Sequence, residues 1–104
     1  MYKLVFFVTE EALDKVKRAV FLAGAGQQGE YSECCWQVKG VGQFLPSLNA
    51  NPTVGVRGEA KQIDEYRVEV RVPIDVKDAC IAALKLAHPY EEPVYEITML
   101  EAWS

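Results

Sequence analysis

Residues 66–72 read YRVEVRV, and this stretch decides the fold. Its apolar side chains alternate with arginine and glutamate, which is typical of a strand that buries one face and exposes the other. A related stretch, LVFFV, occupies residues 4–8, 64 positions before residues 68–72. The two stretches predict that each half of the chain begins with a comparable strand.

The similarity continues after each of these strands. Apolar residues recur at spacings of three and four over residues 10–23 and again over residues 75–87, which predicts two amphipathic helices. Gly24 and Gly26 are expected to end the first helix, because glycine tolerates a left-handed C-terminal cap. Pro89 is expected to end the second, because the residue before a proline avoids helical backbone.

Each helix leads into a second predicted strand, from Tyr31 to Val38 in the first half and from Tyr95 to Met99 in the second. Two βαβ units in succession predict an α+β fold, the ferredoxin-like split βαβ sandwich with element order βαββαβ. Since one fold hosts many unrelated functions, this architecture does not by itself name an activity.

A long irregular excursion, residues 40–62, separates the two halves. It is rich in glycine, proline and asparagine but also contains larger apolar residues, among them Phe44, Leu45, Val54 and Val56. Connections of this length are uncommon unless they bind something or cover a surface, and we expect short irregular strands within it. Val5 and Phe7 make the second face of the first strand apolar too. That sheet face is therefore predicted to be covered, either by the excursion or by another subunit.

The composition is that of a single globular domain over residues 1–104, with 50% apolar and 25% charged residues. A net charge of −4 and scattered basic residues exclude nucleic acid and anionic membranes as partners. The N-terminal apolar run of five residues is too short for a signal peptide, and nothing approaches the roughly 20 apolar residues of a membrane span. We therefore expect a cytoplasmic protein.

The three cysteines are an odd number, which fits poorly with a disulfide-stapled secreted domain. Cys34 and Cys35 are adjacent in a predicted strand, so their side chains should face opposite ways and cannot easily share one metal ion. Cys80 lies on the apolar stripe of the second helix. All three are predicted to be reduced, buried or half-buried side chains.

Two motifs have a functional and a structural interpretation. AGAGQQG, residues 23–29, has the glycines of a phosphate-binding loop, but it closes a helix rather than opening one, so we favour a helix cap. In HPYEEP, residues 88–93, His88 with Glu91 or Glu92 suggests metal ligands or an acid/base pair. The structural alternative places His88 at a helix C-terminus, and we favour it because a lone histidine offers no second imidazole.

A nucleophilic enzyme is the least favoured class. Its cysteine or serine would need an activating base, and His88 is the only histidine. It could approach Cys34 only if the turns after the two helices meet. The paired acidic residues, Asp64 and Glu65 among them, are predicted to be solvated.

Three separated segments carry a family resemblance: AGAGQQGEYSECCW (residues 23–36), the glycine- and proline-containing run at residues 40–55, and HPYEEPVYE (residues 88–96). Over residues 2–101 the chain resembles the CutA/PII-like domain of the NGG-interacting-factor-three proteins of the YqfO type. Those proteins are hexamers whose dinuclear metal centre belongs to a core domain outside the resemblance, so it implies no metal ligands and no cofactor here. The chain is similar to small free-standing bacterial members.

The resemblance implies a non-catalytic, cytoplasmic binding or assembly module whose partner is itself, since CutA and PII relatives tend to form trimers with ligands in clefts between subunits. A homotrimer is therefore expected. Metal binding of the CutA metal-tolerance type is the alternative, which leaves a small molecule or a metal ion open as a further partner. The candidate ligand-binding residues lie in the first and last segments: Tyr31, Glu33, Cys34, His88, Tyr90 and Glu91.

Overall fold

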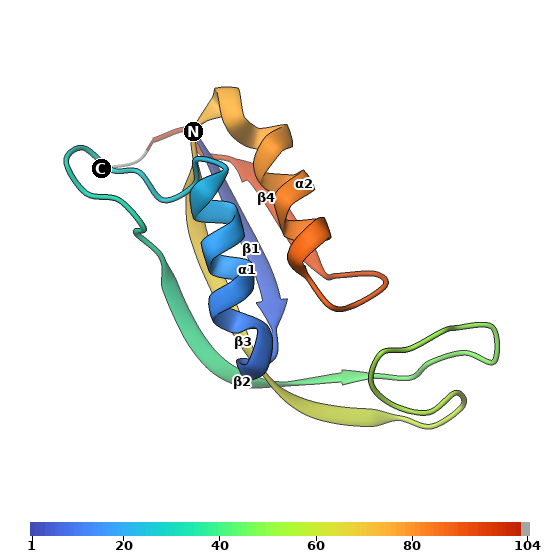
Figure 1. Cartoon of the computed structure of the whole chain (residues 1–104). Helices are drawn as coiled ribbons and strands as arrows, with labels where there is room; N and C mark the ends of the chain where they lie inside the picture. Colours follow the sequence, from blue (N-terminus) through green and yellow to red (C-terminus); the bar gives the residue numbers. More distant parts are fainter. Residues whose placement is uncertain (103–104) are drawn as a thin grey trace.

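The computed structural model describes residues 1–102. Its elements are β1 (Tyr2–Val8), α1 (Glu10–Leu22), β2 (Trp36–Phe44), β3 (Lys61–Val72), the 3₁₀ turn η1 (Ile74–Val76), α2 (Lys77–Ala87) and β4 (Tyr95–Met99). The strands form one antiparallel sheet in the order β2-β3-β1-β4. Both helices pack against the same face of that sheet (Figure 1). The predicted α+β, ferredoxin-like architecture is confirmed.

The core lies between the helices and the two central strands, as the sequence repeat predicts. Leu4 of β1 pairs with Val70 of β3, and Phe6 pairs with Val68, so the alternating apolar residues of both strands share one face. The helices cover this face with five buried side chains, Leu13, Val16, Val20, Cys80 and Leu84. Each fully buried aliphatic or aromatic side chain stabilises the fold by about 1.5–3 kcal/mol.

The predicted helix ends are confirmed. Two glycines with positive φ, Gly24 at +117° and Gly26 at +85°, follow α1. Gly26 is also tightly enclosed, because its N–H donates to the Arg71 carbonyl at 2.8 Å and its own carbonyl accepts from the Cys34 N–H at 2.9 Å. AGAGQQG thus closes a helix and joins it to the end of β3. At the other helix, His88 is extended (φ −73°, ψ 135°), as Pro89 predicts.

The prediction that the second strand begins at Tyr31 is wrong. Tyr31 is 74% exposed and exchanges two backbone hydrogen bonds with Gln28, at 2.9 and 3.0 Å, in a tight turn. Glu33 then adopts a left-handed conformation with φ +57°. These turns interrupt extended backbone, so β2 begins only at Trp36.

The cysteine predictions are partly confirmed. All three cysteines are free, and Cys80 is fully buried between the helices, where its thiol lies 3.8 Å from the Val20 carbonyl. Burial raises the pKa of the Cys80 thiol. Cys34 is half-buried, but Cys35 is exposed, contrary to prediction, because both precede β2 rather than lying in it.

The prediction of short irregular strands within residues 40–62 is wrong, because β2 and β3 simply continue outward. Residues 40–44 of β2 pair with residues 61–65 of β3. The outer parts of these two strands and their connecting loop project away from the helices (Figure 1), and we call residues 40–65 the arm. With dimensions of 47 × 25 × 24 Å, the chain has a radius of gyration of 14.6 Å, against about 13 Å for a compact domain of this length.

The sheet face opposite the helices is covered differently from the prediction. The arm projects from the sheet (Figure 1), yet Val5 is only 3% exposed and Phe7 is half-buried. Glu69 forms ion pairs with Lys3 at 3.5 Å and with Arg67 at 3.2 Å. The Arg67 guanidinium also lies 5.8 Å from the centre of the Phe7 ring. Long charged side chains of the same chain therefore bury Val5 without a second subunit.

Within residues 1–102, neither helix has the length and apolar character needed to cross a membrane.

Candidate ligand-binding cleft

His88 lies in the junction between the end of α2 and the end of β1, where it is 6% exposed. Its Nε2 is 2.7 Å from the Phe7 carbonyl oxygen, and the Tyr90 N–H donates to its Nδ1 at 3.1 Å. A carbonyl only accepts and an amide N–H only donates, so the imidazole is neutral with its proton on Nε2. Burial lowers the pKa of His88, opposed in part by the bond to Phe7. Both ring nitrogens are occupied, which favours the structural interpretation of this histidine.

Tyr90 is held next to His88, with the two rings edge to face at a centroid distance of 4.9 Å. Its hydroxyl oxygen is buried and has no hydrogen-bond partner among the described residues. Burial raises the pKa of Tyr90, and the negative charges of Glu65 and Glu11 raise it further. An unpaired buried hydroxyl costs about 1–3 kcal/mol, so a hydrogen-bond partner for this group would stabilise the site.

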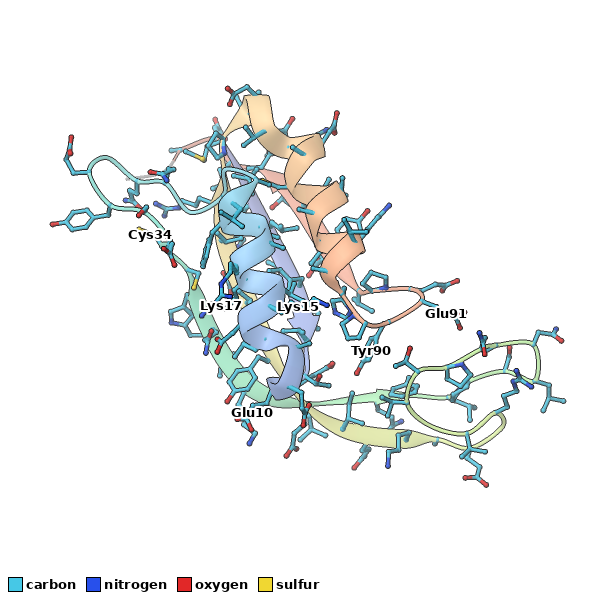
Figure 2. The ribbon with its side chains drawn as sticks, viewed as in Figure 1. Glu10, Lys15, Lys17, Cys34, Tyr90 and Glu91 are labelled. Atoms are coloured by element: carbon cyan, nitrogen blue, oxygen red, sulfur yellow. The ribbon has the colours of Figure 1, made fainter. Side chains whose placement is uncertain are left out.

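The loop at the tip of the arm folds back onto the turn at residues 88–93. The Asn51 N–H donates to the Glu91 carboxylate at 3.0 Å, and the Thr53 hydroxyl donates to the Pro89 carbonyl at 2.9 Å. Figure 2 shows Tyr90 and Glu91 on this turn, on the side of the molecule from which the arm extends. Loop and turn border a cleft of about 430 Å³, within the roughly 300–1,000 Å³ typical of small-molecule sites.

The cleft walls are largely apolar and its charged groups are acidic. Seven apolar residues line it: Phe44, Leu45, Pro46, Ala50, Pro52, Val54 and Val94. Glu65, Glu91 and Glu92 also line it. A cleft with these walls suits an apolar ligand that carries a few hydrogen-bonding groups.

Glu65 lines this cleft, although the sequence predicted that its carboxylate would be solvated. Its side chain lies across Gly42 of β2, where any Cβ would overlap the carboxylate. Burial raises the pKa of the Glu65 carboxyl. The available signal was the glycine at position 42, since a glycine inside a strand often marks a close approach by another group.

The six predicted ligand-binding residues are not brought together within one chain. Tyr90 and Glu91 line the cleft at the arm, and His88 stands behind Tyr90. Cys34 lies at the opposite end of the sheet (Figure 2), where it lines a second cleft of about 530 Å³. Glu33 borders a third depression beside α1, and Tyr31 lines none of these three. Within residues 1–102, no three His, Cys, Asp or Glu side chains are grouped closely enough to hold a metal ion.

No protein-family model matches the chain. Its sequence is similar to proteins named GTP cyclohydrolase 1 type 2 homolog. The one from Mycobacterium tuberculosis is 45% identical over 98 residues, which are 94% of this chain and 26% of that protein. The one from Bacillus subtilis is 40% identical over 99 residues, 95% of this chain and 26% of that protein. The chain spans about a quarter of the length of these relatives.

Solved structures also show similarity to a protein of this kind. A Bacillus cereus protein related to NIF3 superposes with a TM-score of 0.84 at 33% identity, over 97% of this chain and 26% of that one. CutA1 from Pyrococcus horikoshii superposes with a TM-score of 0.72 at 12% identity, over 100% of this chain and 87% of that one, which shows a shared fold. The family resemblance is confirmed: the chain is a homologue of the CutA/PII-like domain of the NIF3 (YqfO-type) proteins.

Proposed function

We propose that this chain is a non-catalytic module that assembles with copies of itself and binds a small ligand in the cleft at the arm. The observation that carries the assembly is the exposed edge strand β2. Among residues 1–102 it pairs with β3 on one side only, and three of its apolar side chains, Trp36, Val38 and Val41, are 57%, 44% and 68% exposed. A long apolar edge strand without a neighbour is a template for pairing with another chain.

The surface area supports the same proposal. The chain exposes 6797 Å², whereas a folded monomer of 11.7 kDa is expected to expose about 5,900 Å². The excess of roughly 900 Å² is close to the ~800 Å² that each partner buries in an interface of standard size.

The sheet ends in two different edge strands, β2 and β4. Pairing of β2 in one copy with β4 in the next would be a head-to-tail contact, which forms a ring when the rotation closes. A closed ring of three copies is our proposal, in agreement with the trimers that the family resemblance implies. We also propose one domain over residues 1–104 and a cytoplasmic location, the latter supported by three unpaired cysteines.

The state of His88 supports the absence of catalysis. The names of the relatives mention a cyclohydrolase, but this chain spans only about a quarter of those proteins. His88, the only histidine, is neutral and has both nitrogens occupied, so it is poorly placed as a base for Cys34, which lies at the other end of the sheet. Metal binding through His88 would require it to lose one of these two bonds, so we do not retain the CutA-type metal alternative.

Light scattering after size exclusion tests the assembly. At micromolar concentration the parent chain should have the mass of three 11.7-kDa chains. Val38→Lys, which places a charge on the β2 edge, should shift the mass toward one chain. Leu86→Lys is the matched control, since Leu86 is 90% exposed on α2 and its replacement should leave the mass unchanged. A parent chain that stays monomeric over the whole micromolar range would refute the assembly.

A further inference from the structure

The charges of the cleft at the arm have one sign. Three glutamates line it, Glu65, Glu91 and Glu92, and no lysine or arginine of the described chain does. Glu91 already accepts a hydrogen bond from the Asn51 N–H. Glu65 forms no ion pair among the described residues. An anionic ligand would therefore be repelled here, and a cation would be attracted.

The Glu65 carboxylate is partly shielded from solvent. It lies on β3 with its carboxylate packed over the bare backbone of Gly42, and its partial burial raises the pKa of the carboxyl. A partly desolvated carboxylate without a counter-charge is costly, and a cation bound beside it removes part of that cost.

Tyr90 supplies a second and independent observation. Its hydroxyl oxygen is buried without a partner among the described residues, and the negative charges of Glu65 and Glu11 add to the effect of burial in raising the pKa of Tyr90. A buried orphan of this kind is uncommon in folded proteins and calls for a ligand, an ion or a water molecule. A group with N–H donors could bind the Tyr90 oxygen and the Glu65 carboxylate together.

The apolar side of the cleft indicates the chemistry of the rest of the ligand. Phe44, Pro52 and Val54 from the arm and Val94 from the start of β4 provide apolar surface. An apolar stem attached to the cationic group would bury against these side chains, at about 25 cal/mol for each Å² removed from water. A bare inorganic cation would leave this wall unused.

We propose that the cleft binds a small organic cation, an ammonium group on an apolar stem, with the ammonium at Glu65 and Tyr90 and the stem against Phe44 and Val54. This inference rests on the ligand-binding half of the proposed function and is independent of the assembly.

Three probes with the same six-carbon stem test the proposal: hexylamine, 1-hexanol and hexanoate, titrated into the parent chain at pH 7. At this pH the amine is protonated, since alkylammonium groups have a pKa near 10. Methyl resonances of Val54 and Val94 in NMR spectra report occupancy of the cleft. Hexylammonium should bind at least about tenfold more tightly than hexanol, as expected for hydrogen bonds to a charged group. Hexanoate should bind most weakly.

Two variants identify the groups involved. Glu65→Gln keeps the shape of the side chain and should reduce the preference for hexylammonium over hexanol to about threefold or less. Tyr90→Phe should weaken hexylammonium more than hexanol. Glu101→Gln is the matched control, because Glu101 is exposed and lies outside the cleft, and it should bind the probes as the parent does.

Equal binding of hexylammonium and hexanol would overturn the proposal and identify an apolar cleft only. It would also be overturned if no probe shifted the Val54 and Val94 resonances, or if Glu65→Gln kept the full preference for the amine. The mass by light scattering is measured on the same samples. If the amine does not bind but the mass of the oligomer is unchanged, the ligand proposal fails while the assembly proposal stands. The two failures can therefore be distinguished.

Discussion

Replacing His88 by alanine should destabilise the protein strongly. The substitution removes two hydrogen bonds, one to the Phe7 carbonyl and one from the Tyr90 N–H, each with a net worth of about 1 kcal/mol. Because His88 is only 6% exposed, its removal leaves the Phe7 carbonyl buried without a partner. For this bond the cost is therefore about 1–3 kcal/mol rather than about 1 kcal/mol. The expected loss is therefore about 3 kcal/mol.

Urea unfolding followed by far-UV circular dichroism, at one protein concentration for all variants, measures this loss. A loss of about 3 kcal/mol corresponds to a melting temperature lower by about 12–24 °C for a domain of this size. Glu92→Ala is the matched control, because Glu92 is an exposed acid of the same turn and surface substitutions stay within about 0.5 kcal/mol. If the free energy of unfolding of His88→Ala lies within about 0.5 kcal/mol of the parent value, the two hydrogen bonds of His88 do not stabilise the fold as argued.

The pH dependence gives a second readout for the same residue. Burial holds the pKa of His88 below its ordinary value of 6.5 in the folded chain. Between that lowered pKa and 6.5, the unfolded chain binds more protons than the folded one, so stability falls as the pH falls. The contribution of neutral His88 is therefore complete above pH 6.5 and is lost on acidification below it. His88→Ala should lose less stability than the parent over that interval, and parallel pH profiles would contradict the mechanism.

Two further predictions concern the C-terminal end of α2 and the cysteines. Pro89→Ala should lower stability by about 0.4–1 kcal/mol, because Pro89 restrains the unfolded chain and keeps His88 extended; an unchanged or higher urea midpoint would contradict this. A thiol reagent should modify exposed Cys35 first and Cys34 more slowly, and it should reach buried Cys80 only on unfolding. Denaturation without reductant should release three thiols, whereas a single thiol would indicate a disulfide.

The parts of the fold that the sequence predicted well depend on local signals. The alternation at residues 66–72 and the spacing in both helices express which face of each element is buried. The helix ends were predictable because Gly26 and Pro89 act through their own backbone preferences. Such signals do not need a neighbour that is distant in sequence.

The errors occur where distant segments decide the outcome. Gly42 favours a loop when it is considered alone, but it lies in β2 because it pairs with Ile63 of β3. The Glu65 side chain fills the space that a side chain at position 42 would take, which is why glycine fits there. Tyr31 resembles the start of a strand, but its backbone pairs with Gln28 in a turn. Val5 was expected to need a cover from outside its own sheet, and instead long ionic side chains of β1 and β3 provide it.

The candidate site was predictable only in part for the same reason. The apolar residues of the arm, Phe44 and Val54 among them, indicated that residues 40–62 needed something to contact. The contact is the turn that carries Tyr90, which is separated from the arm in sequence by the rest of β3 and by α2. Neither segment has a local sequence pattern that predicts its contact with the other. The cleft and the position of Glu65 are therefore visible only in the structure.

HPYEEP has a structural and a ligand-facing part, and this separation determines which variant can identify the ligand site. His88 fixes the junction of α2 with β1 and holds the Tyr90 backbone by a hydrogen bond, so His88→Ala should displace Tyr90 as well as destabilise the fold. Loss of ligand binding in that variant would therefore not identify His88 as a contact. Glu65 lies on a different element, and its carboxylate makes no ion pair within the described residues. Glu65→Gln consequently changes the charge of the cleft without disturbing the turn, which makes it the informative variant for binding and leaves His88→Ala as the informative variant for stability.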